Sequence, residues 1–220
     1  ATCYSWVAYQ TAYLKAHYPA EYMAALMTRR FSQITEITKL MEECKALKIA
    51  TLGPDINESQ IGFGVNKKGE IRFGLAAIKG MGTSAAESIV SEREKNGPYK
   101  DIYDFAERVD LSNVNRKAFE SLAYSGGFDS FGLQREQFFG VSGRDSVFLD
   151  TIVRYGQLFQ TEKAEQQNSL FGGMDAVAVM HPVAPKTEKW PTIEKLNKER
   201  ELVGVYLSAH PLDEYSVVLN

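Results

Sequence analysis

Cysteine, histidine and long apolar runs are all scarce in this chain. Only two of the 220 residues are cysteine, Cys3 and Cys44, and neither lies in a CxxC pair or near a histidine at metal-ligand spacing. This argues against a disulfide framework or a zinc site, and we expect both thiols to be buried as small apolar side chains. No apolar run is long enough for a signal peptide or a membrane span. We therefore expect a cytoplasmic protein without a membrane partner, or an excised piece of such a protein.

Excess positive charge is also missing. The formal net charge is −3, which excludes a chain that wraps nucleic acid through bulk electrostatics. Between Ile71 and Arg135, nine lysines and arginines are matched by nine acidic residues. A phosphate-binding site in that region would have to use oriented backbone amides and a few well-placed cations.

The sequence lacks a cluster of carboxylates of the kind that holds two metal ions for phosphoryl transfer. The acidic pairs and the histidines that are present have no neighbouring base or nucleophile in the sequence, and we expect them to be structural or solvated. These residues are Asp101 with Asp104, Glu92 with Glu94, His17, His181 and His210. We expect no catalytic residue, no metal ion and no cofactor in this chain.

What the chain does contain is helical periodicity. Its 44% hydrophobic and 24% charged residues are typical of a soluble globular protein, and 220 residues allow two or more modules. Apolar residues recur at helical spacing over most of the length. The segments with this pattern are three helices between Ser5 and Leu47, broken near Pro19 and Phe31, then residues 84–95, 101–109, 113–124, 133–139, 146–166 and 192–206. The aromatic side chains of the first part share this period, which favours core packing over stacking on bases: Trp6, Tyr9, Tyr13 and Tyr22.

Glycine and proline mark the places where the helical period stops. Ile61 to Val65 and Glu70 to Phe73 flank a turn at residues 66–69, which predicts a small β-hairpin. Residues 172–190 carry two glycines and two prolines without a clear period, which indicates a linker that runs over the surface.

The most informative segment is the glycine hairpin Gly80, Met81 and Gly82, which opens directly into a helix. Glycines carry no Cβ, so the backbone can turn tightly and approach a ligand closely. Ser84 and Glu87 have the S-x-x-E spacing of a capping box. The unpaired amides and the positive dipole end of a helix N-terminus attract anions. We expect six residues here to contact phosphate, against the alternative of an ordinary turn between packed helices: Lys79, Gly80, Met81, Gly82, Thr83 and Ser84.

The hairpin fits the helix-hairpin-helix pattern G-h-G-x-x-x-A-x-x-h, with Ala86 at the small position and Ile89 at the apolar one. A second glycine turn, at Ser125, Gly126 and Gly127, also lies between two predicted helices but lacks the G-h-G spacing. We interpret it as a degenerate second copy. Its two glycines are weaker candidates for DNA contact, because the turn can equally serve packing.

Several segments together resemble the bacterial replicative DNA polymerase III alpha subunits, which are C-family polymerases. The segments are Tyr9 to Ala25, Leu52 to Asn57, Phe73 to Gly80 and Ser125 to Asp129, and the resemblance covers nearly the whole chain. It implies that the parent protein is a DNA-directed DNA polymerase, a nucleotidyltransferase that binds Mg²⁺ at palm aspartates upstream of this chain. This chain alone is then expected to be inactive, and other replicase subunits are expected partners in the bacterial cytoplasm.

The resemblance also implies a division of the chain, which we expect to be mainly α. The expected units are the helical end of a fingers region (1–50), a connector with the β-hairpin (51–75), a tandem helix-hairpin-helix unit that binds double-stranded DNA (71–140), a helix with a clamp-binding motif (141–172), a flexible linker (173–190) and a helical lead into an OB-fold domain (191–220). Within the tandem unit, Arg116 and Lys117 are expected on the first helix of the second repeat, beside the phosphate path or simply exposed to solvent.

In that family a short motif of the form Q-x-x-L-F or Q-x-x-M-F, after the tandem unit, binds the sliding clamp. Here the matching residues are Gln167, Asn168, Ser169, Leu170 and Phe171. Adjacent leucine and phenylalanine can fill an apolar pocket while the glutamine amide fixes the register. Burial of Leu170 and Phe171 against the preceding helix is the alternative interpretation.

We therefore predict a part of a replicative polymerase that contacts the backbone of duplex DNA and tethers the enzyme to its clamp. Two other classes stay open at this point. One is a helix-hairpin-helix module of a repair or recombination protein that is not an enzyme, and the other is a protein-interaction scaffold.

Overall fold

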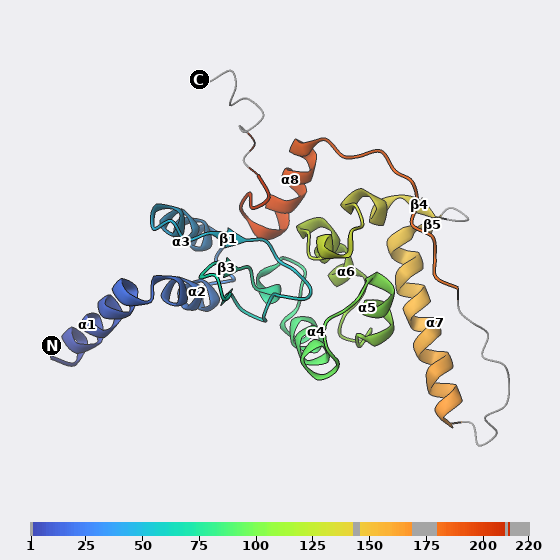
Figure 1. Ribbon diagram of the computed structural model, residues 1–220, viewed down its shortest axis with the longest axis horizontal. Helices are drawn as coiled ribbons and strands as arrows, with labels where there is room; N and C mark the ends of the chain where they lie inside the picture. The colour runs from blue at the N-terminus through green and yellow to red at the C-terminus, as the bar shows by residue number, and fades with distance from the viewer. Residues whose placement is uncertain (1, 143–145, 169–179, 210, 212–220) are drawn as a thin grey trace.

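The computed structural model describes residues 2–142, 146–168, 180–209 and 211. These residues form a mainly helical structure with two small sheets, which confirms the expected fold class (Figure 1). The α-helices are α1 (Thr2–His17), α2 (Pro19–Arg29), α3 (Ile34–Ala46), α4 (Thr83–Asn96), α5 (Ile102–Arg108), α6 (Arg116–Ser125), α7 (Phe148–Asn168) and α8 (Thr192–Val203). Within the described residues, none of these helices is both long and apolar enough to cross a bilayer.

The first three helices differ in how much they bury. Pro19 occupies the opening turn of α2, where its missing N–H costs nothing. Helices α2 and α3 bury Met23, Met27, Ile37, Leu40 and Cys44. Burial raises the pKa of the Cys44 thiol to about 11, as expected for an inert structural cysteine.

Helix α1 has no buried residue, so the expectation that its aromatic residues form a core is wrong. Trp6 is 62% exposed, Tyr9 63% and Tyr13 48%, and Cys3 is exposed as well. The apolar residues of α1 are spread around the helix and do not form one face that could pack on a core. Trp6 and Tyr9 stack on each other instead, with ring centroids 6.0 Å apart. Of the four aromatics, Tyr22 on α2 packs against the core.

The predicted β-hairpin is present and gains a third strand. β2 (Gly64–Val65) pairs antiparallel with β3 (Ile71–Arg72), and β1 (Thr51–Leu52) pairs parallel with the other edge of β3. Gly74, which follows β3, lies too close to the backbone of Gly62 for any side chain. A Cβ at Gly74 would lie 2.4 Å from the carbonyl carbon of Gly62.

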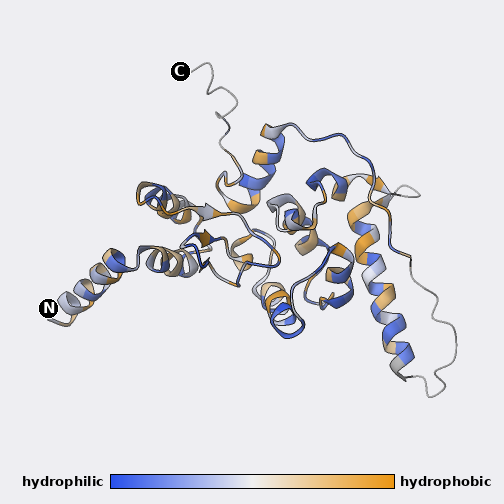
Figure 2. Ribbon diagram, viewed as in Figure 1, coloured by the Kyte–Doolittle hydropathy of each residue, from blue (hydrophilic) through white to orange (hydrophobic). Residues whose placement is uncertain are grey.

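The core of the remaining helices is aromatic. Its rings contact one another edge to face or tilted, with centroid distances between 5.0 and 6.2 Å. They belong to Tyr99, Phe105, Phe119, Phe128, Phe138 and Phe148. Helix α7 packs along α5 (Figure 1), and the Gln160 side chain donates hydrogen bonds to the carbonyls of Ala106 and Val109 at the end of α5. Beyond that point the residues of α7 are mostly hydrophilic (Figure 2).

Two segments differ from the expected elements. The region predicted as a helix over 133–139 is a 3-10 helix, η3 (Arg135–Phe139), which follows the 3-10 turn η2 (Asp129–Phe131). The described part of the expected linker, residues 180–190, is extended and bonded to the body of the molecule. Tyr103 donates to the Pro182 carbonyl at 2.5 Å and Gln137 to the Pro185 carbonyl at 3.0 Å.

Candidate nucleic-acid interface

The glycine hairpin has the backbone geometry that its sequence indicates. A third 3-10 helix, η1 (Leu75–Ala77), precedes it. Gly80 has φ +90°, a conformation that favours glycine. The Met81 amide donates to the Ile78 carbonyl at 3.0 Å, and the Met81 side chain is buried, so this residue anchors the hairpin instead of facing a ligand.

The start of α4 differs from the expected capping box. The N-cap residue is Gly82, which has no side chain to cap the helix, and Ser84 is the second helical residue. The expectation that Ser84 and Glu87 cap each other is therefore wrong. The N–H groups of Gly82, Thr83 and Ser84 have no hydrogen-bond acceptor among the described residues, and all three residues are exposed. Such a helix N-terminus is suited to an anion.

Two lysines lie next to these amides. Lys79 directly precedes Gly80. Lys117 on α6 lies beside Gly80, where a Cβ would come within 3.2 Å of the Lys117 Cε. Both side chains are exposed, and within the described parts of the chain no carboxylate forms an ion pair with either. The structure therefore brings together the exposed amides and two cations that neighbouring acids do not neutralise.

The second copy of the motif lies at a different place from the one expected. Helices α5 and α6 are joined by a hairpin over residues 110–115, in which Val114 is buried like Met81 and Asn115 is the N-cap like Gly82. The buried apolar positions of the helices that follow the two hairpins correspond in order: Ala85, Ala86, Ile89 and Val90 on α4, and Ala118, Phe119, Leu122 and Ala123 on α6. Arg116 and Lys117 thus open the second helix of this repeat, not its first.

Asparagine replaces glycine in this second hairpin. The Asn115 side chain accepts a hydrogen bond from the Ala118 amide at 3.1 Å, so one of the helix-start donors is already satisfied. The shared spacing of Val114, Ala118 and Leu122 with Met81, Ala85 and Ile89 is the sequence pattern that would have revealed this copy.

Gly126 and Gly127 end α6 instead of forming a second phosphate loop. Both are buried, and both amides donate to the Leu122 carbonyl, with Gly126 in the left-handed region at φ +87°. The Gly127 carbonyl accepts from the Ile56 amide at 2.9 Å. Their expected contact with DNA therefore has no support in the geometry.

Arg116 differs from Lys117 although the two are neighbours. Its guanidinium donates to Asp150 of α7 at 2.5 Å and to Glu120 at 2.9 Å. The hydrogen bond to Asp150 holds the pKa of Arg116 above its ordinary value. Its charge is balanced within the molecule, so Lys117 is the better candidate for a phosphate contact.

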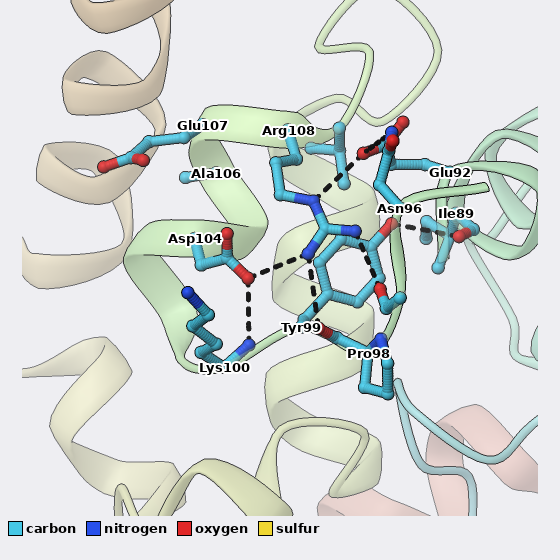
Figure 3. Close-up of polar contacts among 12 residues, drawn as sticks. Ile89, Glu92, Asn96, Pro98, Tyr99, Lys100, Asp104, Ala106, Glu107 and Arg108 are labelled. Atoms are coloured by element: carbon cyan, nitrogen blue, oxygen red, sulfur yellow. Dashed lines mark hydrogen bonds and ion pairs between the residues drawn. The ribbon is translucent and has the colours of Figure 1, made fainter. Parts of the chain in front are cut away.

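Arg108 joins the two repeats (Figure 3). Its guanidinium donates to Glu92 at 3.0 Å, to Asp104 at 2.9 Å and to the Gly97 carbonyl at 2.8 Å, and it lies 4.6 Å from the centre of the Tyr99 ring. These contacts connect α4, the turn after it and α5. Arg108 thus links the first repeat to the second, in addition to the aromatic contacts of Tyr99 with Phe105 and of Phe105 with Phe119.

Known proteins match both this unit and the whole chain. The helix-hairpin-helix motif family matches residues 48–138. The chain is 38% identical over 218 residues to "DNA polymerase III subunit alpha" of Xylella fastidiosa, a match that covers 98% of this chain and 18% of that relative. The same protein of Chlamydia trachomatis is 41% identical over 220 residues, with 97% of this chain and 17% of the relative covered. This chain is related to the DNA polymerase III alpha subunits. It spans less than a fifth of the length of these curated relatives.

Most of the expected clamp-binding motif lies outside the described residues. Of the clamp-binding residues, Ser169, Leu170 and Phe171 lie outside the described residues, as does the side chain of Gln167. Among the described residues, no three histidine, cysteine or carboxylate side chains come together in a way that could hold a metal ion.

Proposed function

We propose that this chain is a non-catalytic part of a DNA polymerase III alpha polypeptide, and that it binds the backbone of duplex DNA without reading its sequence. The observation that carries this proposal is the set of exposed, unbonded amides at Gly82, Thr83 and Ser84 beside Lys79 and Lys117. The parent protein would be a DNA-directed DNA polymerase of the bacterial cytoplasm that works with other replicase subunits. Its Mg²⁺ would belong to the palm, outside this chain.

The chemistry of the hairpin is that of a backbone contact. Amides at a helix N-terminus and lysine ammonium groups recognise phosphate oxygens, which are the same at every base pair, so they position DNA without specifying sequence. The relatives match nearly the whole chain and not the hairpin unit alone. This favours a polymerase over a separate repair module or a scaffold.

The salt dependence of binding tests the role of the two lysines. We expect Lys79→Gln and Lys117→Gln each to weaken duplex binding about threefold and to lower the slope of log K against log salt by about 0.9, because each removes one phosphate neutralisation. Fluorescence anisotropy with a labelled duplex at several salt concentrations measures both quantities. Lys95→Gln, at the exposed far end of α4, is the matched control. An equal change in the control would contradict this assignment.

We also propose that residues 167–171 tether the polymerase to a sliding clamp. The support is the Q-x-x-L-F pattern and its position, since it follows a polar end of α7 whose side chains from 163 to 166 are exposed. A weak motif suffices when polymerase and clamp hold the same DNA, because the second contact is then intramolecular.

A binding assay on a purified bacterial sliding clamp tests this tether. Leu170→Ala combined with Phe171→Ala is expected to weaken binding about tenfold, as for the loss of two anchor residues. Glu165→Gln, which changes an exposed side chain of α7, serves as control and is expected to bind like the original chain. Unchanged binding of the double variant would reject the tether.

A further inference from the structure

The Lys79 peptide, immediately before the hairpin, is held on both sides. Its carbonyl accepts a hydrogen bond from the Ser121 hydroxyl of α6 at 3.0 Å, and its amide donates to the Leu202 carbonyl of α8 at 2.9 Å. Leu202 belongs to the last turn of α8, where helix carbonyls have no partner of their own. The direction in which the hairpin leaves Lys79 therefore depends on where α8 lies.

Helix α8 is positioned in turn by a buried carboxylate, that of Glu199, whose side chain is 1% exposed. One oxygen accepts hydrogen bonds from the amides of Leu207 at 2.6 Å and Ser208 at 2.8 Å. The other accepts from Arg135 at 3.0 Å and from the Ser208 hydroxyl. Four hydrogen bonds thus join α8 to the turn that follows it and to η3.

Arg135 connects this carboxylate to the tandem unit. Its side chain is 4% exposed and also donates to Asp129 at 2.6 Å and to the Tyr124 carbonyl at 3.2 Å. Burial opposes its charge, yet the hydrogen bonds to Asp129 and Glu199 keep the pKa of Arg135 above its ordinary value. Removing one partner of such a buried pair leaves the other charge uncompensated, so the contact between α8 and the end of α6 depends on Glu199.

We propose that Glu199 is a positioning residue for the phosphate-binding hairpin. It holds α8 against α6 (Figure 1), so that the Leu202 carbonyl fixes the Lys79 amide and the hairpin presents its own amides outward. Glu199 is far from the hairpin in the sequence and its side chain is buried, so no local sequence pattern links the two. This inference rests on the proposed binding of duplex DNA for its functional consequence, but its structural step is independent of DNA.

Glu199→Gln tests the inference in the whole chain. The variant keeps the shape of the side chain but replaces one acceptor oxygen by an NH2 group. That group is a donor, and it would face the donors that the oxygen had accepted from. We expect hydrogen exchange of the Lys79 amide to accelerate about tenfold, since its acceptor becomes mobile. Exchange of the Ile71 amide, bonded to the Ala50 carbonyl within the small sheet, is expected to stay unchanged. Duplex affinity is expected to fall about fivefold without a change in the salt slope, because no phosphate-binding cation is removed.

Two comparisons separate positioning from general destabilisation. Glu201→Gln changes an exposed carboxylate on the same helix and is expected to leave both exchange and affinity unchanged. If Glu199→Gln fails to fold, Ser208→Ala offers a milder change. It removes the bond from the Ser208 hydroxyl to Glu199 and the longer bond that this hydroxyl accepts from Arg135 at 3.3 Å, and it is expected to accelerate Lys79 exchange about twofold.

Two results of the exchange experiment would overturn the inference. Unchanged exchange at Lys79 in a folded Glu199→Gln protein would do so, because α8 would then be held by its buried apolar residues Leu196 and Val203 alone. Equal acceleration at Lys79 and Ile71 would also do so, since it indicates general opening. Failure of the original chain to bind duplex DNA would instead reject the proposed function and leave the exchange result standing.

Discussion

Thr83→Pro is expected to weaken duplex DNA binding about 20-fold, equivalent to ~1.8 kcal/mol, the range of a hydrogen bond to a charged group. Proline removes the Thr83 N–H, one of the three exposed amides of the hairpin. Thr83 is the first residue of α4, where proline fits the helix without loss. Gly82 before it has φ −75° and ψ 153°, the extended conformation that a following proline requires.

Thr83→Ala is the matched control, because it removes the side chain and keeps the amide. We expect it to bind DNA like the original chain, and we expect both variants to unfold at the same temperature as the original. Anisotropy titrations with a short duplex give the affinities, and circular dichroism gives the melting temperatures. Equal affinities for Thr83→Pro and Thr83→Ala would show that the hairpin amides do not contact phosphate.

Replacement of Gly80 would not provide so clear a test. A Cβ there would lie 2.6 Å from the Ser121 hydroxyl in a residue with φ +90°. A loss of binding in such a variant would report damage to the hairpin as well as any loss of contact with DNA. Gly82 is different, since a Cβ there meets nothing within 4 Å.

Arg108→Ala is expected to lower the free energy of unfolding by about 3 kcal/mol, the cost of several hydrogen bonds to charged groups lost together. The substitution removes the bonds to Glu92, Asp104 and the Gly97 carbonyl, together with the contact with the Tyr99 ring (Figure 3). Urea unfolding followed by circular dichroism measures the change.

Two further substitutions test whether the loss of stability comes from the guanidinium of Arg108. Arg108→Lys is expected to recover less than half of the loss, because a single ammonium cannot reach all four acceptors of the guanidinium, which include the Pro98 carbonyl at 3.3 Å. Arg154→Ala, at an exposed position of α7, is expected to leave the unfolding free energy unchanged. A loss below ~1 kcal/mol for Arg108→Ala would mean that solvent screening makes these ion pairs weak.

The first hairpin was predictable from the sequence because its geometry depends on glycine. The positive φ of Gly80 and the buried Met81 between two glycines leave few alternatives for the backbone. The second hairpin was missed because Asn115 caps its helix with a side chain, so the expected glycines are absent. The glycines at 126 and 127 resembled a loop in the sequence and instead end a helix.

Other features depend on contacts between segments far apart in the sequence. The burial of Glu199 and Arg135 and the ion pair of Arg116 with Asp150 arise from packing between elements, for which no local pattern exists. The exposure of Trp6 and Tyr9 was missed for another reason, which is the absence of a packing partner. Helical spacing of aromatic residues shows that they lie on a helix, but it does not supply a partner for them.

The exposed groups of the first hairpin belong to the main chain, and this has a consequence for how the site changes during evolution. Thr83 and Ser84 can be exchanged for many other residues while their amides stay in place. Alanine scanning would therefore detect Lys79 and Lys117 but pass over the main-chain groups, and homologous sequences could drift at positions 83 and 84 without loss of the contact. Selection would act instead on Gly80, whose backbone conformation creates the site without any side chain.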